Sequence, residues 1–278
     1  MSRIKEIKFC DSMTVKPHQL NGLDAADWEL IQILSNDPEV ILCDEIDSQL
    51  GELTELRSPS IEFTDEMLAK EISSHIGVNR SSYGTWVYYP WLRKLVRLLP
   101  EEEYIECRTN RNKYKITEEE QQTLSTKRVG VVGLSVGQSV SITMSMERSF
   151  GELRIADFDS LELTNLNRIR TGVQNLGLPK TTIVAREIAE IDPYLTVTIF
   201  KEGLTEDNID EFLTGGGQLD VLVDECDGLF MKYLLRLKSR ALGIPVLMDT
   251  SDNGLIDIER YDHDRNYPLL HGMMNGVD

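Results

Sequence analysis

The chain has 278 residues, of which 41% are hydrophobic and 27% are charged, and its formal net charge is −18 at pH 7. This length and composition are typical of a globular protein with one large domain or two smaller ones. The acidic balance disfavours nucleic acids and membrane surfaces as partners, because their phosphates would be repelled.

No segment predicts insertion into a membrane or secretion across one. The apolar runs are shorter than the ~20 residues that a spanning helix needs, and residues 1–6 lack the apolar core of a secretory signal. The 4 cysteines are widely spaced and form no Cys-x-x-Cys motif, which argues against a disulfide framework or a zinc site. We therefore expect a cytoplasmic protein.

Residues 1–100 contain no catalytic motif and predict an accessory region that is smaller than the rest of the chain and mostly helical. Asp24 and Thr64 are typical helix N-caps, and each precedes apolar residues at helical spacing. A short strand is predicted at residues 40–43. Helices are predicted over residues 25–34, 47–57 and 65–77.

An aromatic segment, residues 83–91, follows these helices. We interpret it as a strand that packs on the next domain, in preference to a ligand-stacking surface, because packing is the commoner role of such side chains. Residues 91–99 have the apolar spacing of an amphipathic helix. Its basic side chains, Arg93, Lys94 and Arg97, would then face solvent.

The second part of the chain is organised around residues 128–137. Residues 129–132 form a short, continuous apolar run, which is typical of a buried parallel strand and breaks at Gly133. Gly133 and Gly137 allow a tight turn, and the helix that follows would direct free N–H groups at a phosphate or nucleotide. Asp157 ends the next apolar run, where a nucleotide-binding βαβ unit places a carboxylate for the ribose hydroxyls.

Strands and helices alternate through the rest of the chain. Together they predict a Rossmann-like α/β nucleotide-binding domain with a mainly parallel sheet, over residues 101–278. His263 and His271 lie in a polar loop outside this alternation, and we expect both to be solvated. Further strands are predicted at residues 153–157, 195–200, 220–223 and 244–249, and helices at 118–125, 181–191, 205–213 and 231–242. Residues 255–261 would begin the next element.

Four short motifs follow the glycine turn, in the order Asp157-Phe-Asp159, Asn165-Leu-Asn-Arg168, Gly177-Leu-Pro-Lys180 and Asp224-Glu-Cys-Asp227. This ordered set resembles the ThiF/MoeB superfamily, which includes the ubiquitin-activating enzymes. The resemblance covers roughly residues 107–262. It implies an adenylyltransferase that uses ATP to activate the C-terminal carboxylate of a ubiquitin-like or sulfur-carrier protein, with release of pyrophosphate.

The same resemblance assigns the nucleotide-binding residues. Asp157 would hold the ribose, and Asp159 would also contact the nucleotide. Gly133, Ser135 and Gly137 of the glycine turn would bind it through their position at the start of the helix.

Cations and a metal ligand complete the implied site. Arg168 and Lys180 would straddle the triphosphate and Asn165 would help to position it, because fixed cations are the main protein contribution to phosphoryl chemistry. Asp227 would support Mg²⁺, which prefers carboxylate oxygens. Arg111 matches an arginine that reaches into the partner subunit's nucleotide site in the superfamily, so we expect a homodimer.

The chain departs from the superfamily pattern in three respects. Ser135 and Gln138 stand where glycines are usual. Nothing matches the zinc-binding cysteine pairs or the thioester cysteine of the superfamily, and Cys226 is predicted to be structural because neighbouring acids would raise its pKa. No closing element is recognisable before residue 278, so we expect the natural chain to continue.

Three alternatives remain open at this stage. The substrate could be the carboxylate of a small molecule, a peptide or a modified tRNA, although the acidic charge disfavours the tRNA. The altered glycine turn is compatible with a non-catalytic nucleotide-binding scaffold. An NAD-dependent oxidoreductase would explain Asp157 and the glycines, but it would leave Arg168, Lys180 and Asp227 without a role.

Overall fold

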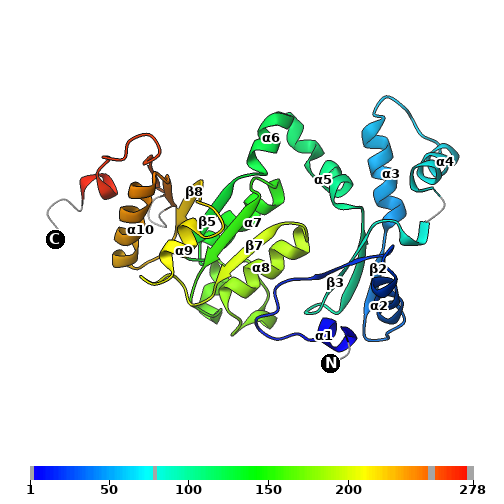
Figure 1. The fold of residues 1–278 in the computed structure, drawn as a ribbon, viewed down its shortest axis with the longest axis horizontal. Helices are drawn as coiled ribbons and strands as arrows, with labels where there is room; N and C mark the ends of the chain where they lie inside the picture. The colour runs from blue at the N-terminus through cyan, green and yellow to red at the C-terminus, as the bar shows by residue number, and fades with distance from the viewer. Residues whose placement is uncertain (1–2, 78–79, 250–253, 274–278) are drawn as a thin grey trace. The chain divides into compact units, whose positions relative to one another are not determined.

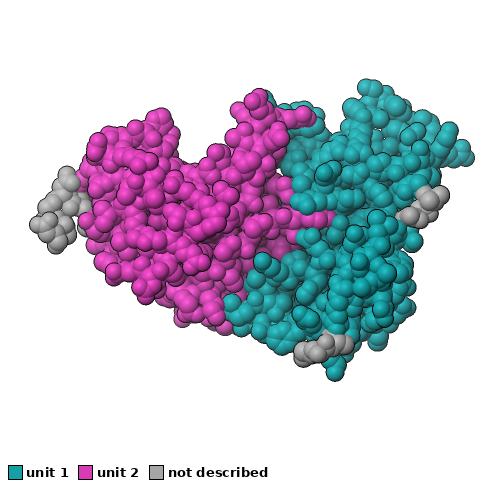
Figure 2. Space-filling view, in the orientation of Figure 1, with its two compact units in different colours: residues 1–117 teal, residues 118–278 magenta. Residues whose placement is uncertain are grey.

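The computed structural model describes residues 3–77, 80–249 and 254–273, and the chain divides into two compact units, residues 1–117 and 118–278 (Figure 2). Compact units are defined by packing alone, so the predicted start of an adenylation domain at residue 101 stays a prediction. Among the described helices, none is long and apolar enough to cross a membrane.

The first unit combines helices with a four-stranded sheet in the order β1-β3-β4-β2 (Figure 1). The β2–β4 pair is parallel and the other two pairs are antiparallel. Its elements are α1 (Arg3–Lys8), β1 (His18–Asn21), α2 (Ala25–Ser35), β2 (Ile41–Asp44), α3 (Ile46–Arg57), α4 (Asp65–Ile76), η1 (Arg80–Ser82), β3 (Thr85–Tyr89), β4 (Lys94–Leu98), α5 (Glu101–Thr109) and η2 (Asn110–Tyr114).

The capping residues that predicted the N-terminal helices act as expected. The Asp24 side chain accepts hydrogen bonds from the first free N–H groups of α2, and the Thr64 hydroxyl accepts one from α4. These bonds satisfy donors that a helix start would otherwise leave unpaired. The helices predicted at residues 25–34, 47–57 and 65–77 are therefore confirmed.

The helix predicted over residues 91–99 is wrong, because residues 94–98 form strand β4. Leu95 and Arg97 are buried while their neighbours are less so, which is the period-two pattern of a strand. Arg97 is only 6% exposed, pairs with Asp44 at 3.2 Å and lies over the ring of Trp86. The prediction that Arg97 faces solvent is also wrong, since this cation is held inside the unit.

The second unit is an α/β domain with a six-stranded sheet in the order β10-β9-β8-β5-β6-β7 (Figure 1). Only β10 runs antiparallel to its neighbour among these strands, so the predicted Rossmann-like, mainly parallel fold is confirmed. Its elements are α6 (Glu118–Leu124), β5 (Arg128–Val132), α7 (Gly137–Glu147), β6 (Glu152–Ala156), η3 (Leu163–Asn167), η4 (Val173–Asn175), α8 (Lys180–Ile191), β7 (Thr196–Phe200), α9 (Ile209–Thr214), β8 (Val221–Asp224), α10 (Leu229–Leu242), β9 (Val246–Asp249), β10 (Ile256–Glu259) and η5 (Leu269–Gly272).

The strand order reverses beside β5. From β5 the chain builds β6 and β7 on one side, and it then returns to place β8 on the other. The loops that leave the carboxyl ends of β5 and β8 therefore turn in opposite directions, which opens a crevice between them. In open α/β sheets this is where ligands bind, so the fold itself indicates where to look for the site.

His263 and His271 differ in their surroundings. His263 is exposed, as predicted. His271 is also exposed, and its Nε2 atom lies 2.7 Å from Oδ1 of the buried Asp257. Sequence reasoning missed this pair, because Asp257 and His271 meet only when η5 packs beside β10.

Candidate nucleotide-binding site

A cavity of about 510 Å³ opens at the carboxyl ends of β5, β6 and β8. It lies at the crevice that the strand order creates. Gly137 and Asn165 do not line it, and Arg111 is an exposed residue of η2 in the other unit. The predicted site residues that do line it are Gly133, Ser135, Asp157, Asp159, Arg168, Lys180 and Asp227.

The turn after β5 requires glycine. Gly133 has a φ of +86°, and a Cβ atom there would clash with the backbone carbonyl of Glu225. Gly137 begins α7, and its Cβ atom would lie 2.6 Å from Cγ1 of Val131. The absence of a side chain at Gly133 lets the β5 turn pack directly against the segment that follows β8, and its absence at Gly137 lets α7 begin close to β5.

Asp157 holds this turn from the neighbouring strand. Its Oδ2 atom accepts a hydrogen bond from the Leu134 N–H at 2.7 Å, and its Oδ1 atom accepts one from the Asp159 N–H at 2.8 Å. The side chain is buried, and this burial raises the pKa of its carboxyl group. A carboxylate can accept about four hydrogen bonds, so acceptor capacity is left for a ligand hydroxyl.

Lys180 places a cation at the centre of the cavity wall. Its side chain is buried, and its Nζ atom lies 2.8 Å from Oδ2 of Asp159 and 3.9 Å from Oδ2 of Asp157. Nζ also donates to the Ser135 hydroxyl at 3.2 Å. The residues predicted from three separate motifs therefore meet around one ammonium group.

Arg168 and Asn165 lie in the loop between β6 and α8. Arg168 is exposed, and it donates to the Asn167 side chain at 2.9 Å. Asn165 is 8% exposed, and its Oδ1 atom accepts from the Glu162 N–H at 2.9 Å in a capping box at the start of η3. Asn165 thus shapes the loop that presents Arg168, and a direct contact of Asn165 with nucleotide stays a prediction.

Gln138 has a role that sequence reasoning missed. It is 1% exposed, and its side chain bonds both the N–H and the C=O of Arg170, at 2.9 and 3.1 Å. Its Nε2 atom also donates to Glu187 of α8 at 3.0 Å. One amide therefore joins α7, α8 and the Arg168 loop, and the available signal was a large polar residue where a glycine is usual.

Comparison with known proteins identifies the family of this chain. The model of the ThiF family matches residues 108–252, more than half of the chain. The chain belongs to the ThiF family.

This ThiF-family chain matches only part of each of its relatives. Over 250 residues it is 44% identical to the uncharacterized protein MT1398 of Mycobacterium tuberculosis, a match that covers 86% of the chain and 34% of that protein. Over 153 residues it is 26% identical to the tRNA threonylcarbamoyladenosine dehydratase of Bacillus subtilis, covering 55% of the chain and 59% of the relative. The chain thus spans between a third and about three fifths of these relatives.

A solved structure agrees with the fold of the ThiF-family unit. The Escherichia coli tRNA N6-threonylcarbamoyladenosine dehydratase in complex with ATP superposes with a TM-score of 0.50 at 25% sequence identity. The superposition covers 55% of this chain and 62% of that one. The predicted superfamily is confirmed by these matches.

Part of the lining of the ThiF-family cavity is apolar. Phe158, Leu204 and Met231 line it, and Phe158 is 77% exposed. Gly203 has a φ of +69°, and a Cβ atom there would lie 2.8 Å from Cδ1 of Phe158. An exposed aromatic side chain beside open space suits a flat, uncharged ring system.

The loop between β8 and α10 closes the cavity. Cys226 lines it, but burial raises the pKa of its thiol to about 12, and its Sγ atom donates to Oδ1 of Asp224 at 2.9 Å. Such a thiol is a poor nucleophile. Asp227 is exposed at the rim, and no group of three or more metal-ligating side chains occurs in the described part of the chain.

Proposed function

We propose that the chain binds ATP in this cavity and catalyses the adenylation of a carboxylate. The observation that carries the proposal is the placement of Lys180, a buried cation between the glycine turn and the two aspartates of the β6 end. Membership of the ThiF family and the likeness to an ATP-bound structure support it.

The residues that line the cavity would suit the base, the ribose and the phosphates of ATP. The apolar part beside Phe158 and Leu204 would take the base, and Asp157 would accept hydrogen bonds from the ribose. Lys180, Arg168 and the N-terminal end of α7 would face the phosphates, because a helix start offers free N–H groups and a partial positive charge.

The reaction needs charge stabilisation more than covalent help from the protein. A carboxylate oxygen attacks the α-phosphorus, the bond to the β-phosphate oxygen breaks, and pyrophosphate leaves with the electron pair. Negative charge grows on the α-phosphate oxygens and on the leaving group, so the fixed cations Lys180 and Arg168 would stabilise the transition state. The acyl-adenylate is the other product.

Mg²⁺ would be held in this site mainly by the substrate. A carboxylate at the rim, such as Asp227, with phosphate oxygens and water is the ligand set that Mg²⁺ commonly takes. When bound, the ion would neutralise triphosphate charge.

The carboxylate substrate that we favour is the C-terminus of a ubiquitin-like or sulfur-carrier protein. Such a substrate has a flexible tail that can enter a cavity open at one side. In this reading Arg111 acts on the phosphates from the partner subunit of a homodimer. The net charge of −18 does not favour association with a polyanion.

A modified-tRNA carboxylate is the second candidate, since three of the matched relatives are named tRNA threonylcarbamoyladenosine dehydratases. If tRNA is the substrate, a basic surface outside this chain would have to supply the affinity. Adenylation in the presence of tRNA, and none with carrier proteins, would support this candidate.

Calorimetric titration with ATP and Mg²⁺ tests the proposal, with NAD as the control ligand. We expect ATP to bind the wild-type chain, NAD to give no heat, and Asp157→Ala and Lys180→Ala to bind ATP more weakly. Pyrophosphate exchange with candidate carboxylates would then identify the substrate. ATP binding without exchange for any carboxylate would favour the non-catalytic scaffold, and NAD binding would favour an oxidoreductase.

A further inference from the structure

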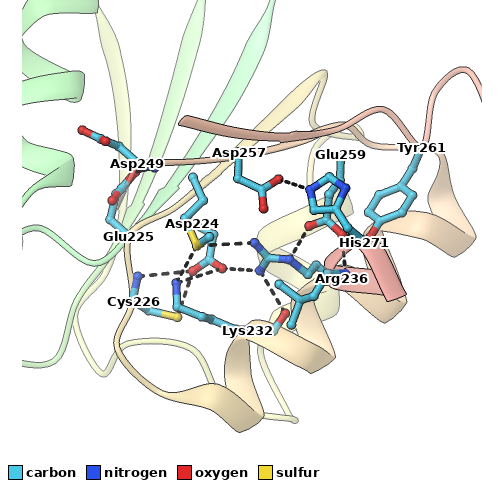
Figure 3. Close-up of polar contacts among 12 residues, drawn as sticks. Asp224, Glu225, Cys226, Lys232, Arg236, Asp249, Asp257, Glu259, Tyr261 and His271 are labelled. Carbon is cyan, nitrogen blue, oxygen red and sulfur yellow. Dashed lines mark hydrogen bonds and ion pairs between the residues drawn. The ribbon is translucent and has the colours of Figure 1, made fainter. Parts of the chain in front are cut away.

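A buried charged cluster lies directly behind the candidate site (Figure 3). Asp224 at the end of β8, Arg236 of α10 and Glu259 of β10 are each 0% exposed. The Arg236 guanidinium forms ion pairs with both carboxylates, through NH1 to Asp224 and through Nε to Glu259. We call these three residues, together with Lys232, the Arg236 cluster.

Burial of so many charges has a high cost. Removing a carboxylate or a guanidinium from water costs several kcal/mol, which is offset only when the partners are well placed and hydrogen-bonded. Lys232 contributes the second cation, with its Nζ atom 3.3 Å from Oδ2 of Asp224. Two cations therefore balance two carboxylates, and the pattern indicates a specific arrangement rather than a solvated surface.

One end of the cluster holds the wall of the nucleotide cavity. Oδ1 of Asp224 accepts hydrogen bonds from the Cys226 N–H at 3.2 Å and from the Cys226 thiol at 2.9 Å. These bonds fix the turn over residues 225–228, which lines the cavity and carries Asp227. The position of this turn therefore depends on where Arg236 holds Asp224.

The other end of the cluster holds a strained turn. Oε1 of Glu259 accepts hydrogen bonds from the Tyr261 hydroxyl and, at 2.7 Å, from the Leu270 N–H. Leu270 and His271 have φ values of +46° and +53°, a left-handed conformation that is unfavourable for residues other than glycine. Such a conformation persists only where surrounding bonds impose it, and Glu259 supplies one of them.

We propose that Arg236 is a positioning residue that couples the nucleotide cavity to the turn over residues 269–272. The inference rests on the proposed nucleotide binding. A single planar guanidinium joins the carboxylate that fixes the cavity turn to the carboxylate that fixes η5. Because its N–H donors have a fixed geometry, the guanidinium sets the orientation of each carboxylate as well as neutralising its charge. Binding that orders the cavity turn would therefore also stabilise η5, and the coupling must act equally in both directions.

Hydrogen exchange measured by mass spectrometry tests the coupling in the full chain. The Leu270 amide is a direct reporter, because it donates to a side chain of the Arg236 cluster. We expect saturating ATP with Mg²⁺ to slow exchange in the peptide that contains Leu270 by about fivefold or more, in the range of ordinary coupling. A merely structural role of the cluster would leave this exchange independent of ATP.

Matched variants on one strand separate coupling from general stability. Glu259→Gln keeps the volume and an acceptor for Leu270 but removes the charge that pairs with Arg236. Asp257→Asn, two residues earlier, breaks only the pair with His271. We expect Glu259→Gln to lose the ATP effect on Leu270 and to weaken ATP binding by the factor seen in exchange, while Asp257→Asn keeps both within about twofold.

Arg236→Lys provides a second measurement, because an ammonium group retains the charge but cannot form the fork. A folded Arg236→Lys protein in which ATP still protects Leu270 would overturn the proposal. ATP binding by the wild type with unchanged exchange at Leu270 would also overturn it, and would leave the proposed function intact. Absence of ATP binding by the folded wild type would overturn both.

Discussion

Lys180 and Asp159 are joined twice, since the Lys180 ammonium donates to the Asp159 carboxylate at 2.8 Å and the Lys180 N–H donates to the Asp159 carbonyl at 2.9 Å. The first residue of α8 is thereby fixed to the loop that follows β6. The cation is held in place before any ligand arrives, so little side-chain entropy would be lost when a phosphate binds.

Removal of this cation should affect ligand binding more than folding. We expect Lys180→Ala to weaken ATP binding by about 10- to 100-fold, because a hydrogen bond to a charged group contributes about 1.5–3 kcal/mol. Calorimetry gives the affinity. Lys238→Ala breaks an ion pair with Asp210 outside the cavity and is the matched control. Equal losses in both variants would contradict a role of Lys180 in the site.

The glycine turn should not tolerate a methyl group. We expect Gly133→Ala to lower the free energy of unfolding by about 2–4 kcal/mol, from the positive φ and the clash with Glu225 together. Gly216→Ala is the control, since it has a φ of +68° but open space around its Cβ position, and it should cost only about 1–2 kcal/mol. Urea denaturation measures both, and similar values would show that the close approach is unimportant.

Loss of the Gln138 amide should loosen the loop that carries Arg168. Gln138→Ala would leave the part-buried polar groups of Arg170 and Glu187 without this partner, at a cost of about 1–3 kcal/mol. We expect a stability loss of that size and a several-fold weaker binding of ATP. Unchanged exchange of the residue 168–171 amides in this variant would argue against the role.

Cys226 should be unreactive in the folded protein. A pKa of about 12 leaves roughly one thiol in ten thousand ionised at pH 8, compared with about a quarter for an ordinary cysteine. We therefore expect iodoacetamide to modify the exposed Cys10 first. Mass spectrometry after timed quenching follows each site, and rapid labelling of Cys226 in native buffer would show that its thiol is not held as described.

The buried carboxyl group of Asp157 should make stability depend on pH. Burial raises its pKa in the folded state, so its contribution to stability is complete below its unfolded pKa, about 3.9, and is lost as pH rises through the folded pKa. The stability of the wild type relative to Asp157→Asn should therefore fall as pH rises above about 4. Urea denaturation from about pH 4.5 to 8 checks this sign.

Asp262 gives the opposite case and serves as a control. A hydrogen bond from Arg260 lowers the pKa of its carboxyl group, so its contribution is present above its unfolded pKa and is lost only in acid. The stability of the wild type relative to Asp262→Asn should stay constant over the same pH range. A parallel decline in both comparisons would point to a general effect of net charge.

The sequence was sufficient for much of the α/β unit. Short apolar runs that end at Gly133, Asp157 and Asp224 correspond to β5, β6 and β8, and the carboxyl ends of parallel strands gather at one edge. The motif residues at this edge of the sheet were therefore expected to lie close together. Asp157, Asp159 and Lys180 do meet, although their contacts with a nucleotide stay predictions.

Long-range pairing explains what the sequence did not predict. The apolar residues of 91–99 fit both periods. Strand β4 pairs with its neighbour β3 and with β2, and β2 comes from a distant segment. Arg236 gave no local signal either, because its carboxylates lie on β8 and β10 and are brought together only by the fold. The same is true of Gln138, whose partners lie beyond residue 169.

The reversal of strand order beside β5 divides the cavity between two stretches of chain. Ser135, Arg168 and Lys180 come before β7, whereas Leu204, Asp227 and Met231 come after it. A chain cut in the loop after β7 would therefore yield two fragments, neither with a complete binding surface. A ligand that contacts both fragments would hold them together, so the two fragments should associate more tightly as ligand is added.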